Sequence, residues 1–224
     1  DARVDDAEWG SAAWTEDFGE MASGARPEAA LRSRVKMLWD DSHLYIAADI
    51  AGPYLWAEMT RHDSPLYQEN AFEFFIDPDG DNHEYYEFEI NARNTTWDLF
   101  LPRPYRDGGQ GLSSWEILGL QSAVRLDGTL NDASDVDRGW TIEIAVPWFS
   151  LGEQARRPVP PRPGEQWRVN FTRVESALRR DGSAHRKIEG QPSRVFSWAR
   201  QYVTDIHRPE TWGYVQFERA ARPF

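Results

Sequence analysis

The clearest pattern of apolar and polar positions lies in segment 69–91, where two alternating runs flank an Asp-Gly turn. Successive side chains of a β-strand point to opposite faces, so Phe72 and Phe74 share one face while Glu73 lies on the other. The returning run places four residues on the polar face: Tyr85, Glu87, Glu89 and Asn91. We therefore predict two antiparallel strands with one core face and one solvated, acidic and aromatic face. Such a face suits a polyhydroxylated ligand, and it equally suits an ordinary sheet surface.

Runs of the same kind recur along the chain with turn signals between them. They predict further strands at 34–39, 44–50, 55–60, 96–101, 140–146, 166–174 and 212–217. Helix signals are scarce, and the best is a short turn at 148–151. No internal repeat has the fixed period of a propeller or solenoid. The pattern predicts an all-β fold, an antiparallel β-sandwich of jelly-roll type with long surface loops and little helix.

Two segments follow no strand or helix period. Segment 102–114 is rich in Pro, Gly and Ser, which predicts a long surface loop. Segment 156–164 is rich in proline and suits an extended connector that is too short to join separate domains. We therefore expect residues 1–224 to form a single domain, because β-sandwiches of this length are routinely single domains.

Composition narrows the range of partners. The net charge of −12 repels phosphate backbones and anionic lipids, which argues against nucleic acid as a partner. No stretch has the length of a membrane-spanning helix, so we expect no membrane insertion. The absence of cysteine excludes disulfides, thiolate metal sites and cysteine nucleophiles. The residues after Asp1 do not form a signal segment, so for an exported protein we expect this chain to be the mature form.

Alternating aspartates at Asp77, Asp79 and Asp81 offer oxygen ligands of the kind that calcium prefers. The spacing does not match an EF-hand, because Gly80 is the fourth position of the loop rather than the sixth. Asp-Gly is also a preferred pair in tight hairpin turns, and this structural explanation is the stronger one. A calcium site of another type remains an alternative.

Acidic residues on the polar face raise the question of glycoside hydrolysis. Glu73, Glu87 and Glu89 are expected to lie close together, and that reaction needs two carboxyl groups about 5–9.5 Å apart. Carboxylates on the outer side of a strand are more often a solvated surface. The histidines show no H-E-x-x-H spacing, and no G-x-S-x-G elbow or P-loop is present.

The 11 tryptophans are a stronger indication of sugar binding, because sugar rings present C–H faces that pack on aromatic planes. Trp39, Trp140 and Trp167 are in phase with aliphatic neighbours and are expected in the core. Four aromatic residues adjoin polar or loop segments and are candidates for ligand contact: Tyr67, Trp97, Trp198 and Trp212.

Five blocks of sequence, in this order, resemble the carbohydrate family 9 binding-domain-like proteins. The blocks are VKMLWDDSHLYIAADI, SPLYQENAFEFFIDPDGDNHEYYEFEIN, RGWTIEIAVPW, QWRVNFTRVE and HRPETWGYVQF, and they span residues 35–217. The resemblance implies a β-sandwich related to the family 9 carbohydrate-binding modules of xylanases. Those modules bind the ends of sugar chains between aromatic side chains, carry structural calcium and have no catalytic activity.

The resemblance assigns several site residues. One clamp tryptophan of the modules corresponds to Tyr67, and a strand glutamate corresponds to Glu73. Glu89 stands where the modules have arginine, while Asn91 matches their asparagine. The exchange of arginine for glutamate removes a cationic donor, for which Arg173 is the candidate replacement.

The second clamp tryptophan of the modules falls near Ile206, which does not stack comparably on a sugar ring. Candidates to replace it are His207, Trp198 and Trp212. The predicted binding residues are therefore Tyr67, Glu73, Glu89, Asn91, Trp97, Arg173, Trp198, His207 and Trp212.

These observations together favour non-catalytic binding of plant-type polysaccharide fragments or sugar chain ends. The resemblance further implies structural calcium, carbohydrate-active enzymes as partners, and an extracellular or periplasmic location. Three alternatives stay open. They are a glycoside hydrolase or lyase that uses the paired glutamates, a haem-binding sandwich with ligands among Met37, Met59 and His207, and an interaction domain that has lost sugar binding.

Overall fold

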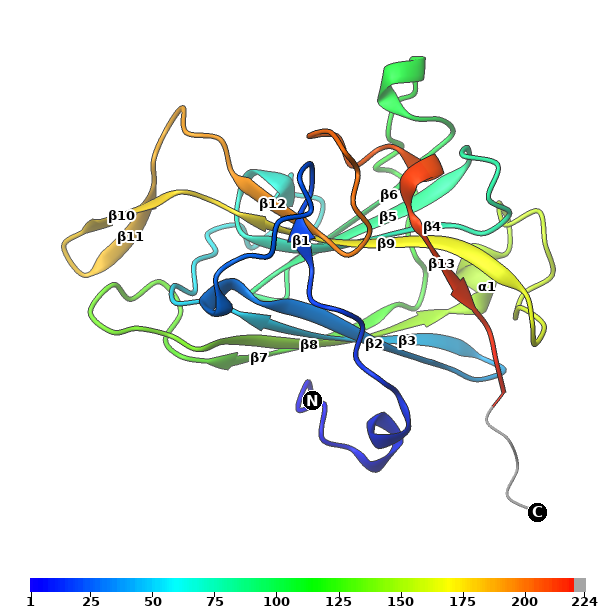
Figure 1. Cartoon of the computed structure of the whole chain (residues 1–224), viewed down its shortest axis with the longest axis horizontal. Helices are drawn as coiled ribbons and strands as arrows, with labels where there is room; N and C mark the ends of the chain where they lie inside the picture. The colour runs from blue at the N-terminus through cyan, green and yellow to red at the C-terminus, as the bar shows by residue number, and fades with distance from the viewer. Residues whose placement is uncertain (220–224) are drawn as a thin grey trace.

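A computed structural model describes residues 1–219, and two antiparallel sheets lie face to face in it (Figure 1). In spatial order the larger sheet contains β1 (Gly19–Glu20), β12 (Arg194–Ser197), β9 (Gln166–Glu175), β4 (Ala71–Asp77), β5 (Tyr85–Asn91) and β6 (Thr96–Leu101). An additional strand, β13 (Gly213–Gln216), also pairs with β9. The smaller sheet contains β2 (Ser33–Trp39), β3 (His43–Ala51), β8 (Gly139–Pro147) and β7 (Gln121–Asp127). A separate hairpin consists of β10 (Leu178–Asp181) and β11 (Ala184–Lys187).

Helical structure is confined to short turns. The single α-helical turn of the described chain is α1 (Trp148–Leu151), at the predicted position. The 3-10 turns are η1 (Ala7–Ser11), η2 (Ala29–Leu31), η3 (Leu66–Gln68), η4 (Tyr105–Asp107) and η5 (Pro209–Thr211). The predicted fold class, an antiparallel β-sandwich with little helix, is therefore confirmed. Within residues 1–219, no helix has the length and apolar character needed to cross a membrane.

The hydrophobic core lies between the two sheets and follows the predicted alternation. Phe72 and Phe74 of β4 and Phe88 of β5 are buried in it, and the rings of Phe74 and Phe88 stack with centroids 5.0 Å apart. The facing sheet contributes apolar residues such as Ile46 and Ile144. Burial of these side chains is the main favourable contribution to the stability of the sandwich.

The opposite face of β4 and β5 differs from the prediction, because it is covered rather than solvated. Every residue of the two strands is buried, and the exposed fractions of Glu73, Glu87 and Glu89 are 4%, 5% and 1%. A second apolar cluster lies on this outer face and contains Phe75, Tyr85, Leu99, Leu101 and Trp212. Chain segments that are distant in sequence cover the strands, which local alternation does not indicate.

Two local predictions are also corrected. Residues 55–60 do not form a strand. The backbone N–H groups of Glu58 and Met59 donate to Oε2 of the Glu69 side chain and not to a neighbouring strand. The Asp-Gly turn is not a tight hairpin, since residues 78–84 separate β4 from β5. Gly80 in this loop has φ = +72°, a conformation that glycine adopts without strain.

Candidate functional site

The outer face of the larger sheet carries a cavity of about 540 Å³. Its sheet side is built by Glu73 on β4, Glu87 and Glu89 on β5, Trp97 on β6 and Val174 on β9. Other residues that line it come from η3, η4, segment 204–207, β12 and the residue after β1: Tyr67, Tyr105, Thr204, Asp205, Ile206, His207, Val195 and Met21. Five of the predicted binding residues therefore share one cavity, namely Tyr67, Glu73, Glu89, Trp97 and His207. The cavity has no Arg or Lys among the described residues that line it.

An aromatic pair lines one part of the cavity. The rings of Tyr67 and Trp97 have centroids 5.7 Å apart and planes inclined by 33°. Tyr67 is 51% exposed, whereas Trp97 is partly buried. The two rings are packed against each other, so they leave no gap between them that a sugar ring could occupy. The aromatic surface that they present suits the C–H face of a sugar ring.

Three carboxyl groups lie on the sheet side of the cavity. Burial raises the pKa of Glu73 to about 7, and the hydroxyl of Thr172 donates a hydrogen bond to its carboxylate. Burial, followed by the neighbouring charge of Glu73, raises the pKa values of Glu87 and Glu89 well above the ordinary value. Desolvation disfavours the charged form of an acid, so this group retains protons near neutral pH. A protonated carboxyl group can donate a hydrogen bond as well as accept one.

Two polar atoms at the cavity have no hydrogen-bond partner within residues 1–219. They are Nε1 of Trp97 and Oε2 of Glu89, and both are buried. Glu89 and Trp97 are directly opposite each other on the paired strands β5 and β6. Buried polar groups are nearly always paired, because leaving one unpaired costs about 1–3 kcal/mol. Neither atom is exposed to solvent, so a ligand hydroxyl would accept from the indole and donate to the carboxyl oxygen only after a side-chain movement that opens these atoms to the cavity.

His207 lines the cavity as a neutral ring. Burial lowers its pKa to about 4, so the imidazole is uncharged at neutral pH. Its Nδ1 and the hydroxyl of Tyr85 share a hydrogen bond of 2.9 Å, and its ring packs edge-on against Tyr105. The indole of Trp212 donates to the backbone carbonyl of Ile206 over 2.9 Å, which holds the segment in place.

Asn91 does not line the cavity, although it shares a strand face with Glu89. It is fully buried, and its Nδ2 donates to the carbonyl of Met59 over 2.9 Å and to Oε1 of Glu69 over 2.6 Å. Its Oδ1 accepts from the backbone N–H groups of Arg93 and Thr95. All of these bonds hold adjoining loops, so the observed role of Asn91 is structural.

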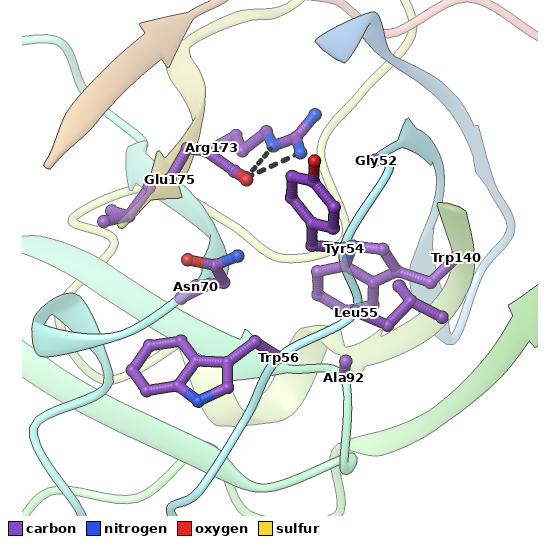
Figure 2. Close-up of a pocket in the computed structure, with 11 residues that line it drawn as sticks. Gly52, Tyr54, Leu55, Trp56, Asn70, Ala92, Trp140, Arg173 and Glu175 are labelled. Atoms are coloured by element: carbon purple, nitrogen blue, oxygen red, sulfur yellow. Dashed lines mark hydrogen bonds and ion pairs between the residues drawn. The ribbon is translucent and has the colours of Figure 1, made fainter. Parts of the chain in front are cut away.

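Arg173 does not line the cavity either. It lies instead at a separate small pocket (Figure 2). Its Nη2 is 2.6 Å from Oε2 of Glu175, and Nη1 donates to the carbonyl of Leu31 over 3.1 Å. The guanidinium group lines a separate pocket of about 10 Å³, which holds no more than one water molecule. The prediction that Arg173 supplies a donor to the ligand therefore finds no support in its position. Donors on the residues that line the cavity are Trp97, the protonated carboxyl groups and the hydroxyl groups of Tyr67, Tyr105 and Thr204.

The other two tryptophans have packing positions. Trp212 is buried against Phe75 and Tyr85, with ring centroids 5.4 Å and 5.1 Å away. Trp198 packs on Phe171 and lies against Gly213, where a Cβ atom would be only 2.5 Å from the indole ring. Neither of these tryptophans lines the cavity.

Eight residues that line the cavity were absent from the predicted binding set, and Glu87, Tyr105 and Asp205 are among them. Glu87 was considered only for hydrolysis, although alternation places it on the face of Glu89. Tyr105 lies in the loop that follows no period, and Asp205 precedes the segment that matched a clamp position. No pattern in either segment indicates which side chain reaches the sheet.

The aspartates proposed for calcium do lie together. Ligand oxygens of Asp77, Asp79 and Asp81 are all within 4.8 Å of one another. Asp77 also accepts the backbone N–H groups of Gly80 and Asn82, at 2.8 Å and 3.0 Å. These bonds explain the aspartates as loop-forming residues, and calcium binding there stays a prediction. For haem, neither Met37 nor Met59 lines the cavity that contains His207.

The fold and the cavity together describe a β-sandwich that carries a cavity on the outer face of one sheet. Comparison with known families places the chain more narrowly. The model of the family described as carbohydrate family 9 binding domain-like matches residues 1–216. The chain belongs to this family, as the resemblance of its sequence blocks implied.

Individual relatives agree with this assignment. Over 116 residues the chain is 27% identical to exoglucanase XynX of Acetivibrio thermocellus, a match that covers 52% of this chain and 9% of that protein. The match thus covers only a small part of the length of this relative. A family 9 module from Caldicellulosiruptor kristjanssonii in complex with glucose has a TM-score of 0.62 and 17% identity, covering 100% of this chain and 93% of that one. Its complex with cellotriose gives a TM-score of 0.62 and 18% identity, with coverage of 99% and 89%. These structures share the fold.

Proposed function

We propose that the protein is a non-catalytic carbohydrate-binding module that holds a neutral sugar in the cavity on the outer face of the larger sheet. The observation that carries this proposal is the presence of two unpartnered polar atoms, Nε1 of Trp97 and Oε2 of Glu89, on cross-strand neighbours that line the cavity. They offer one donor and one acceptor next to an aromatic surface. This combination matches a sugar, whose ring is apolar on its faces and carries hydroxyl groups at its edge.

The size and charge of the cavity support the same ligand class. Its volume of about 540 Å³ lies within the range of roughly 300–1,000 Å³ for small-molecule sites. The glutamates retain protons near neutral pH and the described lining has no Arg or Lys, so nothing in it attracts an anion. A neutral polyhydroxylated molecule is therefore favoured over a phosphate or a carboxylate.

The structural relatives support a glucose-based ligand, because the Caldicellulosiruptor kristjanssonii module was solved with glucose and with cellotriose. We infer that the ligands of this chain are fragments or chain ends of plant polysaccharides. The relationship to exoglucanase XynX supports an extracellular or periplasmic role beside carbohydrate-active enzymes. Structural calcium belongs to the proposal on family grounds, with Asp77, Asp79 and Asp81 as the candidate ligands.

Isothermal titration calorimetry against glucose, cellotriose and xylan fragments, in buffer with calcium, tests this function. We expect binding that the Tyr67→Ala variant weakens by about tenfold, because the ring supplies part of the aromatic surface. Tyr214→Ala is the matched control, since Tyr214 is 56% exposed and lies outside the cavity. Absence of heat with every sugar, or equal weakening by both variants, would contradict the proposal.

Glycoside hydrolysis is the competing function, and the three buried glutamates with raised pKa values are the observation that favours it. A glycosidase needs an acid that stays protonated near its working pH. Product analysis on the same sugars separates the two functions. A wild-type protein that binds sugar and releases no product is a binding module, whereas product release that is lost in Glu73→Gln identifies a hydrolase.

A further inference from the structure

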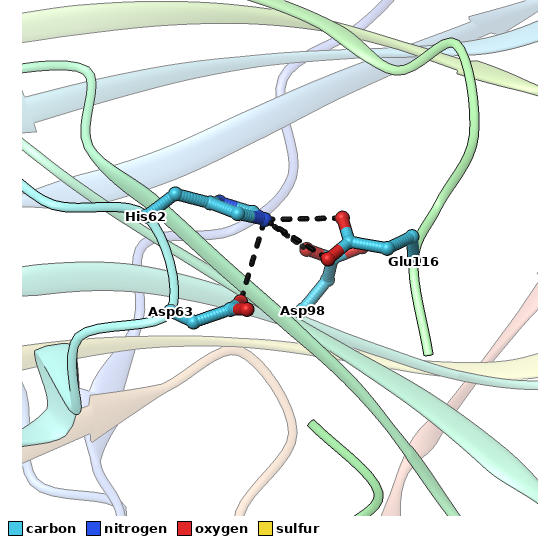
Figure 3. Close-up of side chains that lie close together, drawn as sticks. All are labelled: His62, Asp63, Asp98 and Glu116. Carbon is cyan, nitrogen blue, oxygen red and sulfur yellow. Dashed lines mark hydrogen bonds and ion pairs between the residues drawn. The ribbon is translucent and has the colours of Figure 1, made fainter. Parts of the chain in front are cut away.

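We propose that His62, Asp63, Asp98 and Glu116 form a binding site for a divalent transition-metal ion of the zinc type. The four side chains come from three separate parts of the chain and converge at one edge of the sandwich (Figure 3). His62 and Asp63 precede η3, Asp98 is on β6, and Glu116 lies in the long connection between η4 and β7. The proposal does not depend on sugar binding.

The distances between the potential ligand atoms suit a small ion. Nε2 of His62 is 3.0 Å from Oε2 of Glu116, 3.4 Å from Oδ1 of Asp63 and 3.7 Å from Oδ1 of Asp98. Ligands of a tetrahedral zinc ion, with bonds of about 2.0–2.2 Å, lie roughly 3.3–3.6 Å from one another. All four atoms in the protein are within 4.8 Å of one another, so only small side-chain movements are needed to bind the ion.

The imidazole is oriented as a metal ligand would be. Nδ1 of His62 is 3.0 Å from the backbone carbonyl oxygen of Thr96, which can only accept a hydrogen bond. Nδ1 therefore donates its proton to this carbonyl. Nε2 faces the three carboxylates and is 3.0 Å from Oε2 of Glu116, which can only accept, so a metal ion would bind Nε2 in place of the proton that it carries there. Metal-binding histidines are commonly fixed in this way by a backbone carbonyl or a carboxylate.

Asp98 supplies a second and independent indication of a bound cation. Its side chain is only 5% exposed, and Oδ2 accepts the backbone N–H of Ile117. Oδ1 accepts no hydrogen bond from any residue in the described part of the chain, and it points toward Nε2 of His62. A carboxylate in so buried a side chain is stabilised by a cation beside its second oxygen, and a metal ion bound by Nε2 of His62 would lie next to Oδ1.

The charges in the cluster favour a divalent ion over a proton. Three carboxylates surround a single imidazole, so protonation of His62 leaves an excess of negative charge. A divalent cation compensates for more of that charge and uses the lone pair on Nε2. The nitrogen ligand distinguishes this site from the Asp77 loop, which offers oxygen only, and selects a zinc-type ion rather than calcium.

A bound ion would fix the surroundings of the sugar cavity. Asp98 directly follows Trp97, His62 and Asp63 directly precede the turn that carries Tyr67, and Glu116 belongs to the connection that begins after η4. Coordination would therefore join the segments next to Tyr67 and Trp97 to the connection that follows η4. We expect the ion to reduce the mobility of these segments.

Titration of chelator-treated protein with Zn²⁺ alone, followed by calorimetry and thermal unfolding, tests the site. We expect one equivalent to bind and Tm to rise. Co²⁺ in place of Zn²⁺ should give the intense visible absorption of a low-coordinate Co²⁺ ion with a nitrogen ligand. Absence of Zn²⁺ binding, or binding of Ca²⁺ in preference to Zn²⁺, would overturn the proposal.

Two variants assign the ion to these residues. His62→Ala and Asp98→Asn should each weaken Zn²⁺ binding by at least about tenfold. His83→Ala is the matched control, because its imidazole is 52% exposed and that of His62 is 46% exposed, and it should bind Zn²⁺ as the wild type does. His62 is at the surface, so its variant should retain the wild-type circular dichroism. Folded His62→Ala with unchanged Zn²⁺ affinity would contradict the site.

Discussion

The two faces of the β4–β5 strand pair are both buried, but they are buried by different parts of the molecule. The inner face packs Phe74 and Phe88 against the smaller sheet. The outer face packs Phe75 and Tyr85 under Trp212, beside a row of buried glutamates. The inner face is a uniform hydrophobic core, whereas the outer face combines an apolar cluster with a polar cavity. The inner face stabilises the fold through apolar packing alone, and the outer face is where the proposed function places the ligand.

The covering of the outer face explains its unusual electrostatics. Carboxyl groups on an open sheet would be solvated and charged at neutral pH. Here segment 204–207 and the turns η3 and η4 reduce contact with water, so Glu73, Glu87 and Glu89 keep raised pKa values. A protein tolerates such a cost where the groups have a function. The predictions below compare the two faces, from the largest expected effect to the smallest.

Truncation on the inner face should have the largest effect. Phe74→Ala removes a fully buried ring from the core and should lower the free energy of unfolding by about 3–5 kcal/mol. Urea unfolding followed by tryptophan fluorescence measures this change. Phe149→Ala is the control, because Phe149 is 64% exposed and its truncation should change stability little. An equally small change in both variants would show that the inner face is not the stabilising face.

The buried carboxyl groups of the outer face should make stability depend on pH. The pKa of Glu73 is about 7 in the folded protein, so the folded state binds more protons than the unfolded state above the ordinary value of 4.5. The stability from this group is complete at low pH and is lost as pH rises through about 4.5 to 7. Between pH 5 and pH 8 the wild type should lose about 2 kcal/mol of its free energy of unfolding through this group. The Glu73→Gln variant should not show this loss.

Unfolding by urea at several pH values measures this difference between the wild type and the variant. Asp77 and Asp98, whose pKa values are also raised by burial to about 6, act in the same direction and cancel in the comparison. Glu189→Gln, at an exposed position, should keep the pH dependence of the wild type. A Glu73→Gln variant with the same pH dependence would mean that this carboxyl group is charged in the fold.

Sequence patterns predict the two faces better than they predict the cavity. Alternation correctly places Phe72, Phe74 and Phe88 in the core, because a strand has a fixed period of two. The same period assigns Glu73 and Glu89 to one face, and both do line the cavity. What covers that face depends on contacts between segments distant in sequence, and no local period reports such contacts.

The limits are clearest at individual residues. Arg173 is in a strand next to β4, but its guanidinium group forms an ion pair with Glu175, two residues along the chain. Tyr105 reaches the cavity from a loop of Pro and Gly, where backbone geometry rather than residue type sets its direction. The edge strand β7 was missed because it is half-exposed and begins with Gln121 and Ser122, so its alternation is weak.

Asn91 should separate structure from binding on the outer face. Asn91→Ala removes the hydrogen bonds to Met59 and Glu69, and it should lower the free energy of unfolding by about 2 kcal/mol. The dissociation constant for sugar should stay within about twofold, because the side chain does not line the cavity. Gln121→Ala, on an exposed edge strand, serves as the stability control. Weakened sugar binding in a folded Asn91→Ala protein would extend the site to this residue.

The smallest change tests a single atom of the proposed site. Trp97→Phe keeps an aromatic plane next to Tyr67 but removes the indole N–H that has no partner in the described protein. If a sugar hydroxyl accepts from this N–H, the variant should weaken binding by about 1 kcal/mol, or roughly fivefold in the dissociation constant. Calorimetry measures the change, with Trp14→Phe as the control outside the cavity. Stability should not fall, because the lost N–H forms no bond within the described protein. Unchanged affinity would leave Trp97 as an apolar surface alone and would remove the observation on which the proposed function rests.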